Sequence, residues 1–315
     1  MARSGLPPGP GNAQPTTAPR RRHPRYSRAE TVSAYGMLLP GLVGTIMFSL
    51  LPIGLAVHSS FYDSGFYQAP NFVGFNNFLK VLRDRYFSQA ILVGLRYTLY
   101  VVPLLIVLSF AFANLIKRLT GRFAGFVKTT IFVPNVISGV IASFMFVYIF
   151  DYQAGILNSM LKLFGIGAQP WLQNPTLALI AMAAPRIWLA FGWTTLLMLG
   201  GLLDIPETYY ESATIDGAGR FKQMVYITIP SMRNTLLFVL VSNVIGMMQE
   251  FDLPYNMTRG GPASATTTPN LYVYTHFVRD QTVGFSISAA LLIAIVLGGL
   301  STLIFRLVSS EKSYE

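Results

Sequence analysis

The chain has 315 residues, of which 52% are hydrophobic and only 11% are charged. Soluble domains carry charges on about a quarter of their residues, so this composition predicts a polytopic membrane protein. The absence of cysteine excludes disulfides, thiolate metal sites and cysteine nucleophiles. The net charge is +10, and six arginines in residues 1–34 make part of this basicity a property of the N-terminal tail.

Residues 1–34 are rich in Pro, Gly, Ala and Thr and show no apolar period. Such a segment cannot bury enough surface to offset its ordering entropy, so we expect a disordered, basic, cytoplasmic tail. The apolar stretch after it is too long for a secretory signal, carries Pro40 and Pro52, and has no convincing small-residue cleavage site. We therefore expect an uncleaved first membrane helix.

Six segments are long and apolar enough to cross a bilayer, which requires about 20 largely apolar residues each. In chain order they cover about residues 35–57, 90–116, 125–150, 177–203, 235–255 and 283–308. Between the first two, residues 61–88 are too polar and too short to span. The run at 71–78 predicts a turn that enters an interfacial helix, and a plain connector is the alternative.

The predicted fold is thus an all-α integral membrane domain of six helices over residues 35–308, followed by a short cytoplasmic tail at 309–315. Its orientation is predicted from Lys and Arg, which are enriched in cytoplasmic loops. By parity, the N-terminal tail lies on the same side as two basic connections, which hold Lys117, Arg118, Arg122 and Lys128, and Arg220, Lys222 and Arg233. The opposite loops hold Lys80, Arg83, Arg85, Lys162, Arg259 and Arg279. This bias predicts a multi-pass membrane protein with both termini in the cytoplasm.

The connection between the fourth and fifth segments, about residues 204–234, is more strongly patterned than a connector requires. Pro206 can open a helix, and Gly217 permits a turn that residues with a Cβ resist. A second amphipathic stretch has apolar residues at i, i+4 and i+8 from Phe221, and Pro230 marks its end. We expect a helix, a turn and a second helix on the cytoplasmic face.

This loop resembles the EAA motif of permeases in binding-protein-dependent ATP-binding-cassette importers. The family pattern is Glu, a small residue, Ala, three residues, Gly, nine residues, Ile, one residue, an aliphatic residue and Pro. It is matched without a gap by Glu211, Ala213, Gly217, Ile227 and Pro230. Ser212 stands where the family usually has Ala, and Ile229 where it usually has Leu. Both departures conserve volume.

The resemblance covers about residues 37–308, and within the family the chain is similar to the carbohydrate-transporter branch. It is carried by Leu39-Pro40, the run at 72–78, Pro134, the runs at 155–158 and 171–172, and the run at 257–262. The Gly260-Gly261-Pro262 element, followed by Thr266 to Thr268, is similar to the "first" permease of the maltose and glycerol-phosphate type.

The resemblance implies a type I importer permease fold whose EAA loop is a coupling helix that docks on a separate ATPase. The residues that it assigns to coupling are Glu211, Ser212, Ala213, Asp216, Gly217, Ala218, Phe221, Ile227 and Pro230. The chain has no phosphate-binding loop of the Gly-x-x-x-x-Gly-Lys-Ser/Thr kind, so it would be no enzyme, and ATP and Mg would bind the partner ATPase. The alternative reading of the loop is an interfacial helix that merely joins two spans.

The same resemblance implies the partners of the chain. They are a second homologous permease that forms a heterodimer with this one, two copies of the ATPase subunit and an extracytoplasmic solute-binding protein. A carbohydrate is the implied substrate and membrane lipid the surrounding medium, with no nucleic acid involved.

Charged residues at bilayer depth usually face the interior of a helix bundle and mark solute paths. Three stand out here, Arg186, Glu250 and Asp252, the last near the outer interface, where external water would solvate it. Helical spacing places a stripe on one face of each of the fourth and fifth segments: Arg186, Ala190 and Trp193, and Asn243, Gly246, Met247 and Glu250.

These two stripes offer hydrogen-bonding groups for sugar hydroxyls and an aromatic face for a sugar ring. In maltose-type permeases, which the sequence resembles, substrate contacts come from the corresponding helices. Two alternatives remain open: Arg186 and Glu250 pair only with each other, or they act with Asp252 as the ion relay of a stand-alone secondary transporter or channel. The three histidines are widely separated, so neither a metal triad nor a catalytic dyad is supported.

Overall fold

The computed structural model describes residues 28–67 and 69–309, and this part of the chain is almost entirely helical. Of the tail predicted to be disordered at 1–34, residues 1–27 lie outside the described residues, whereas residues 28–34 belong to a helix, so the prediction is wrong for them. Of the tail predicted at 309–315, residues 310–315 also lie outside the described residues. Contacts divide the chain into two units, Met1–Ile53 and Gly54–Glu315, which are described separately.

The first unit contains α1 (Arg28–Thr45), the π-helical segment η1 (Ile46–Leu50) and the beginning of α2 (Leu51–Ser60). Helix α1 begins at Arg28, before the start expected at residue 35, and it continues through Pro40. Residues Val32–Ser60 form a continuous apolar helix of 29 residues. This length exceeds the 20 or so residues that a bilayer core requires.

The second unit begins with a small outer element. Strands β1 (Tyr62–Asp63) and β2 (Asn71–Phe72) pair antiparallel, with Tyr62 opposite Phe72. Helix α3 (Asn76–Arg83) follows, so the segment predicted as a turn and a helix forms both. The buried Asn77 donates its amide hydrogens to the carbonyls of Ser60 and Tyr62, at 3.0 and 2.9 Å, and thereby fixes this element to the end of α2.

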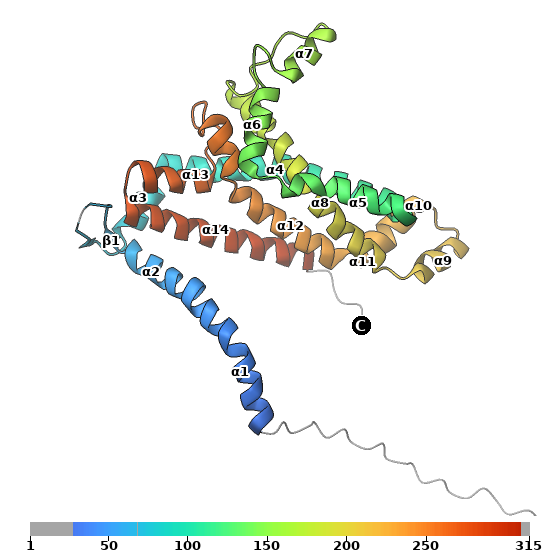
Figure 1. Ribbon diagram of the computed structural model, residues 1–315, viewed down its shortest axis with the longest axis horizontal. Coiled ribbons are helices and arrows are strands. Elements are labelled where there is room, and N and C mark those ends of the chain that lie inside the picture. The colour runs from blue at the N-terminus through green and yellow to red at the C-terminus, as the bar shows by residue number, and fades with distance from the viewer. Residues whose placement is uncertain (1–27, 68, 310–315) are drawn as a thin grey trace, which may run out of the picture. The chain divides into compact units, whose positions relative to one another are not determined.

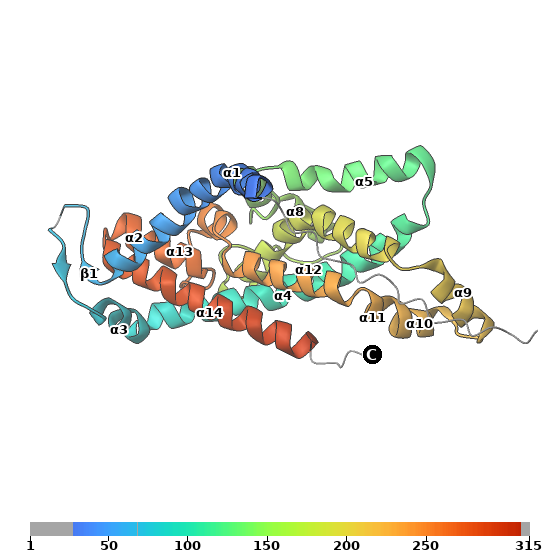
Figure 2. The same ribbon diagram turned by 90° about the horizontal axis from the view of Figure 1, so that it is seen from below.

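The remaining elements of the second unit are α4 (Arg85–Lys117), α5 (Gly121–Val136), α6 (Gly139–Ile149), α7 (Ile156–Leu163), α8 (Pro175–Leu203), α9 (Glu207–Ile215), α10 (Arg220–Gln223), η2 (Met224–Thr228), α11 (Ile229–Ser231), α12 (Arg233–Met248), η3 (Pro254–Thr258), α13 (Pro269–Tyr274), η4 (Thr275–Arg279) and α14 (Val283–Ser309). Figure 1 shows α4, α5, α8, α12 and α14 running alongside one another, while α6 turns away and leads to α7. In both views β1 and α3 lie at one end of this unit and α9 and α10 at the other (Figure 2).

Within the described residues, four helices are long and apolar enough to cross a membrane, or up to six if each of two bent pairs is one span. The unbent helices are Val32–Ser60, Arg85–Lys117, Pro175–Leu203 and Val283–Val308. The bent pairs are Gly121–Val136 with Gly139–Ile149, at 92°, and Arg220–Ser231 with Arg233–Met248, at 70°. The helical architecture with several apolar spans is confirmed, and the predicted number of six is the upper value.

The third predicted segment, residues 125–150, is two helices rather than one. Pro134 lies in the last turn of α5, and Ile137 is extended, with φ −74° and ψ 134°. Ser138 then caps the new helix, because its hydroxyl oxygen accepts the amide hydrogen of Val140 at 3.2 Å. A cap of this kind satisfies a backbone donor that a helix start leaves open, so the chain can turn here inside an apolar segment.

Helices α4 and α8 pack along each other and form the centre of the second unit. Tyr97 of α4 donates its buried hydroxyl to the carbonyl of Met182 in α8 at 3.1 Å. On the other face of α8, a Cβ on Gly192 would lie 2.1 Å from the carbonyl oxygen of Ile131 in α5. Only glycine permits this close approach of the two backbones. These contacts fix the positions of α4 and α5 relative to α8.

At the end of the second unit that carries β1 and α3, the side chain of Asp84 joins α4 and α13. Its side chain accepts the amide hydrogen of Tyr86 and so caps α4, and it accepts the hydroxyl of Tyr272 from α13 at 2.5 Å. Burial and this hydrogen bond to the carboxylate raise the pKa of Tyr272 well above its ordinary value. The tyrosine therefore remains a hydrogen-bond donor at physiological pH.

Candidate functional site

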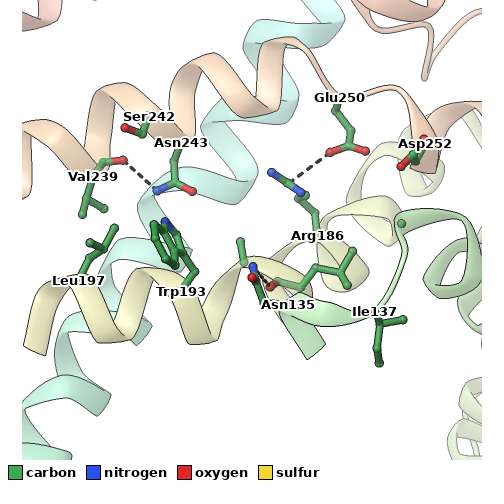
Figure 3. A pocket seen from close by; sticks show the side chains of 13 residues that line it. Asn135, Ile137, Arg186, Trp193, Leu197, Val239, Ser242, Asn243, Glu250 and Asp252 are labelled. Carbon is green, nitrogen blue, oxygen red and sulfur yellow. Dashed lines mark hydrogen bonds and ion pairs between the residues drawn. The ribbon is translucent and has the colours of Figure 1, made fainter. Parts of the chain in front are cut away.

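A cavity of about 310 Å³ lies between α8, α12 and the break that separates α5 from α6 (Figure 3). Its lining is mixed, with charged, amide and aromatic side chains beside aliphatic ones. The residues are Asn135, Ile137, Gly139, Arg186, Leu189, Ala190, Trp193, Leu197, Val239, Ser242, Asn243, Glu250 and Asp252. Because these helices are among the apolar ones, the cavity places polar groups within a membrane-spanning bundle.

The two charged residues predicted on α8 and near α12 meet at this cavity. Arg186 Nε lies 3.2 Å from Glu250 Oε2, and the glutamate side chain is 8% exposed. The buried Nε nevertheless lacks hydrogen-bond geometry to any described acceptor. The pair therefore lowers the electrostatic cost of burying two charges, while the rest of the guanidinium remains available to a further acceptor.

The position of Glu250 differs from the prediction. Helix α12 ends at Met248, with Gln249 as its C-cap, so Glu250 follows the helix instead of continuing one of its faces. Its carbonyl accepts the buried hydroxyl of Thr268 at 2.6 Å. Glu250 therefore lies in a non-helical segment that is fixed by this hydrogen bond, and its carboxylate points toward Arg186 (Figure 3).

The break between α5 and α6 contributes a wall of the cavity that the sequence did not predict. Asn135 donates from Nδ2 to the carbonyl of Leu189 in α8 at 3.3 Å. A Cβ on Gly139 would lie 2.5 Å from Asp252 Oδ2, so glycine is required for the aspartate to lie against the first turn of α6. Pro134-Asn135 and Ser138-Gly139 are the sequence signals that could have indicated this wall, because they mark a helix end and a helix start.

Trp193 and Asn243 form the opposite part of the lining (Figure 3). The indole is 51% exposed within the chain, and Asn243 lies across the cavity from it. The amide nitrogen of Asn243 donates to the carbonyl of Val239 at 2.8 Å, which leaves its Oδ1 as an acceptor. An aromatic face, an amide acceptor and a guanidinium donor around one cavity are suited to a polyhydroxylated solute.

Five of the seven residues predicted for the solute path line the cavity: Arg186, Ala190, Trp193, Asn243 and Glu250. The other two do not. A Cβ on Gly246 would lie 3.4 Å from Arg186 Nη2, so this residue lies behind the guanidinium. Met247 is fully buried and belongs to the apolar core.

At the other end of the second unit, residues 207–230 form the predicted helix, turn and second helix. Helix α9 ends in a Schellman motif: the amide of Ala218 donates to the carbonyl of Ala213 at 2.8 Å, and the amide of Gly217 donates to Thr214 at 3.0 Å. Gly217 has a φ of +73°, and a Cβ there would meet nothing within 4 Å. Glycine is thus required by the backbone conformation and not by crowding.

The two arms of this loop are tied together by side chains. Gln223 donates to Thr214 Oγ1 at 3.0 Å and to the carbonyl of Ala218 at 3.1 Å. The hydroxyls of Tyr210 and Thr228 lie 3.0 Å apart. Ile227 packs against the cluster of apolar residues formed by α4, α8 and α12, so the second arm is anchored in the helix bundle.

The same loop carries large apolar side chains that are exposed. Ile215 is 87% exposed, Phe221 73% and Tyr226 76%. Of the residues predicted for coupling, Glu211, Ser212, Asp216 and Gly217 are also exposed. Exposed apolar side chains gathered on a hydrogen-bonded loop are typical of a surface that another molecule covers.

Comparison with known proteins agrees with this architecture. A family profile described as the binding-protein-dependent transport system inner membrane component matches residues 97–312. The chain is 32% identical over 262 residues to the trehalose/maltose transport system permease protein MalF of Thermococcus litoralis, covering 82% of this chain and 88% of that protein. It is 30% identical to the lactose transport system permease protein LacF of Rhizobium radiobacter, covering 84% and 90%.

Two solved structures have the same fold. One is a bacterial ABC transporter involved in the import of the acidic polysaccharide alginate, with a TM-score of 0.77 at 22% identity, covering 90% of this chain and 98% of that one. The other is a bacterial alginate ABC transporter in complex with an alginate pentasaccharide-bound periplasmic protein, with a TM-score of 0.75 at 21% identity, covering 88% and 94%. The chain therefore belongs to the family of inner membrane components of binding-protein-dependent transport systems, and it is a multi-pass permease of that family.

Proposed function

We propose that the chain is the membrane-spanning permease of an ATP-driven importer that carries a carbohydrate or a carbohydrate derivative. Its relatives are named as permeases for trehalose and maltose and for lactose. The cavity beside Trp193 supports the proposal, because it combines an aromatic face with several hydrogen-bonding groups. Arg186, Asn243 and Glu250 would bind hydroxyls, and the indole would cover the C–H side of a sugar ring.

The proposed assembly contains this chain, a second homologous permease and two copies of an ATPase subunit, which binds the ATP and Mg. An external solute-binding protein delivers the solute. The structure of the alginate transporter with its loaded periplasmic protein supports this expectation, because that transporter has the fold of the present chain. Both termini are proposed to lie in the cytoplasm, where the basic connections at 117–128 and 204–234 would also lie.

The observation that carries the coupling proposal is the loop at residues 207–230. Its Glu, Ala, Gly, Ile and Pro positions have the EAA spacing, and Ile215 and Phe221 lie exposed beside the rigid turn at Gly217. A docked ATPase subunit would cover these side chains. The second arm reaches the apolar core through Ile227, so movement of the loop would be transmitted to α8 and α12.

The proposed cycle is the one that the family resemblance implies. Closure of the ATPase subunits on ATP draws the coupling loops of the two permeases together, and the attached helices rotate. Because α8 and α12 carry opposite walls of the cavity, their relative movement opens the cavity toward the outside and admits the solute from the binding protein. Release of the nucleotides returns the helices and exposes the solute to the cytoplasm.

The docking role is tested by single-cysteine cross-linking, since the chain contains no cysteine of its own. In the assembled complex, Ser212→Cys is labelled with a thiol-reactive benzophenone and irradiated with and without ATP. We expect an adduct with the ATPase subunit whose yield changes with ATP. Leu163→Cys, which is also exposed but lies at the end of α7, is the control and should give no such adduct. Equal yields from the two positions would refute docking at the loop.

A further inference from the structure

A second, larger cavity of about 660 Å³ lies where the C-terminal end of α4 meets the loop at residues 207–230. It is separate from the solute cavity and shares no lining residue with it. Its walls come from the last two turns of α4, the start of α9, and α10 with η2. The lining residues are Phe110, Ala111, Asn114, Lys117, Arg118, Glu207, Tyr210, Arg220, Gln223, Met224 and Thr228.

More positive than negative side chains line this cavity. Lys117, Arg118 and Arg220 line it, against the single carboxylate of Glu207. Lys117 donates to the carbonyl of Leu202 at 3.2 Å and lies 5.0 Å from the ring centre of Tyr210, which fixes its ammonium at the cavity wall. Among the described residues, no carboxylate lies within ion-pair distance of either arginine. Two guanidinium groups from different elements thus line one cavity, and neither forms an ion pair with a described carboxylate.

The cavity also has an apolar side. Phe110 and Ala111 lie two turns before the end of α4, and at a rise of 1.5 Å per residue the basic end of the helix is about 10 Å farther along its axis. One wall is therefore apolar and belongs to a membrane-spanning helix, whereas the other is cationic and lies at the helix end. This order from apolar to cationic matches an amphiphile at a membrane surface, with its acyl chain along the helix and its anionic head at the arginines.

We propose that this cavity binds a phosphate-bearing anion, supplied by the headgroup of an acidic phospholipid in the leaflet that faces the loop. The phosphate lies between Arg118 and Arg220, which bind it through charge-assisted hydrogen bonds. The lipid thereby connects the end of α4 to the second arm of the loop. The proposal rests on the membrane insertion of the chain, and it is independent of the solute carried and of docking by an ATPase.

The test is native mass spectrometry of the full-length chain in a neutral detergent, with titration of three probes. Phosphatidic acid carries both the phosphate and the acyl chains, sn-glycerol 3-phosphate is the same head without the chains, and phosphatidylcholine is a lipid without net charge. The test variant is Arg118→Gln with Arg220→Gln. The control, Arg122→Gln with Lys128→Gln, removes two positive charges from α5 residues that do not line the cavity. Arg118→Lys with Arg220→Lys retains the charge.

We expect the unaltered chain to bind phosphatidic acid in preference to phosphatidylcholine. The double Gln variant in the cavity should bind it about tenfold more weakly, and the control and the Lys variant should remain within about twofold of the unaltered chain. Equal affinities of the cavity variant and the control would overturn the proposal. If sn-glycerol 3-phosphate binds as tightly as phosphatidic acid and the double Gln variant in the cavity loses this binding, the site belongs to a soluble phosphate and the lipid assignment is overturned.

Discussion

At the scale of single residues, Trp193 and the Arg186–Glu250 pair have different roles in the proposed solute site. The indole is half exposed within the chain, whereas the two charges form an ion pair at 3.2 Å. The aromatic side chain should therefore affect solute handling alone. Loss of either charge should affect both solute handling and stability.

Trp193→Ala is expected to lower the amount of solute imported per ATP hydrolysed, because the aromatic face would no longer stabilise the solute inside the cavity. An aromatic contact contributes about 0.5–1.5 kcal/mol, which corresponds to a decrease of about two- to tenfold. The measurement is simultaneous uptake and ATP hydrolysis by the complex in proteoliposomes. Trp193→Phe retains an aromatic face and should stay near the unaltered ratio; an equal loss in both variants would exclude stacking.

Removing one member of the charge pair leaves the other buried without a partner, at a cost of the order of 3 kcal/mol. Arg186→Gln and Glu250→Gln should each lower the midpoint of thermal unfolding of the complex. The double variant should recover most of this loss and still fail to transport, because the solute contacts are absent. Normal uptake by the stable double variant would mean that the pair is structural only and would leave the solute site to other residues.

At the scale of elements, the close packing of α8 on α5 depends on Gly192. A Cβ at this position would overlap the backbone of Ile131, so Gly192→Ala should destabilise the complex by about 1–3 kcal/mol and lower its unfolding midpoint. Gly200→Ala is the matched control in the same helix, where a Cβ meets nothing within 4 Å and alanine improves helix propensity. Equal midpoints for the two variants would contradict the packing described for α5 and α8.

Substitutions at Gly217 can distinguish the conformation that the backbone requires from the space that a docked ATPase subunit requires. Its φ of +73° disfavours residues with a Cβ by about 1–2 kcal/mol, with Asn the best tolerated. Gly217→Asn should retain most of the binding-protein-stimulated ATP hydrolysis of the assembled complex, and Gly217→Ala should retain less. In Gly217→Trp, the Cβ would meet no atom of this chain within 4 Å, but the indole would project into the proposed docking surface. This variant should therefore abolish the stimulation of ATP hydrolysis. Stimulation by Gly217→Trp equal to that of Gly217→Asn would contradict docking at this turn.

A comparison of the helices with their predicted ranges shows which parts of the fold are predictable from the sequence. The long apolar runs at 90–116, 177–203 and 283–308 predicted α4, α8 and α14 closely, because length and apolarity are sufficient to identify a span. The third and fifth segments still count as spans if each bent pair crosses once, but neither is one continuous helix over its predicted range, because hydropathy measures apolarity and not helical continuity. The helix break at Pro134 and Ser138 places Asn135 and Gly139 in the wall of the cavity, although the segment around it is apolar. The end of α12 at Met248 likewise places Glu250 outside the helix, where it faces Arg186.

The loop at residues 207–230 was predicted more completely because its signal is local. The turn depends on Gly217 and the spacing of the apolar residues, both of which are visible in sequence. Its connections to the rest of the chain were not predictable. The hydrogen bond between Gln223 and Thr214 crosses the turn between side chains that no motif pairs. Arg118 and Arg220 come from distant parts of the sequence and line one cavity only after folding.

At the scale of the whole molecule, the chain has the cavity lined by Arg186 and Trp193, which is the proposed solute site, and the loop at residues 207–230 with its exposed apolar side chains. Helices α8 and α12 run between them and belong to both. This arrangement explains how a chain without a phosphate-binding loop can take part in ATP-driven transport, since the energy would enter at the loop and be used at the cavity. The alternative of a stand-alone transporter provides no role for the loop.

The most direct test of coupled import is uptake by proteoliposomes that contain either the complete complex or this chain alone. Trehalose, maltose and lactose are supplied outside with the solute-binding protein, with ATP or a proton or sodium gradient as the energy source. We predict accumulation of a sugar only by the complete complex, only with ATP in the compartment that faces the loop, and none by the chain alone. Uptake by the chain alone, driven by an ion gradient and indifferent to ATP, would contradict this account.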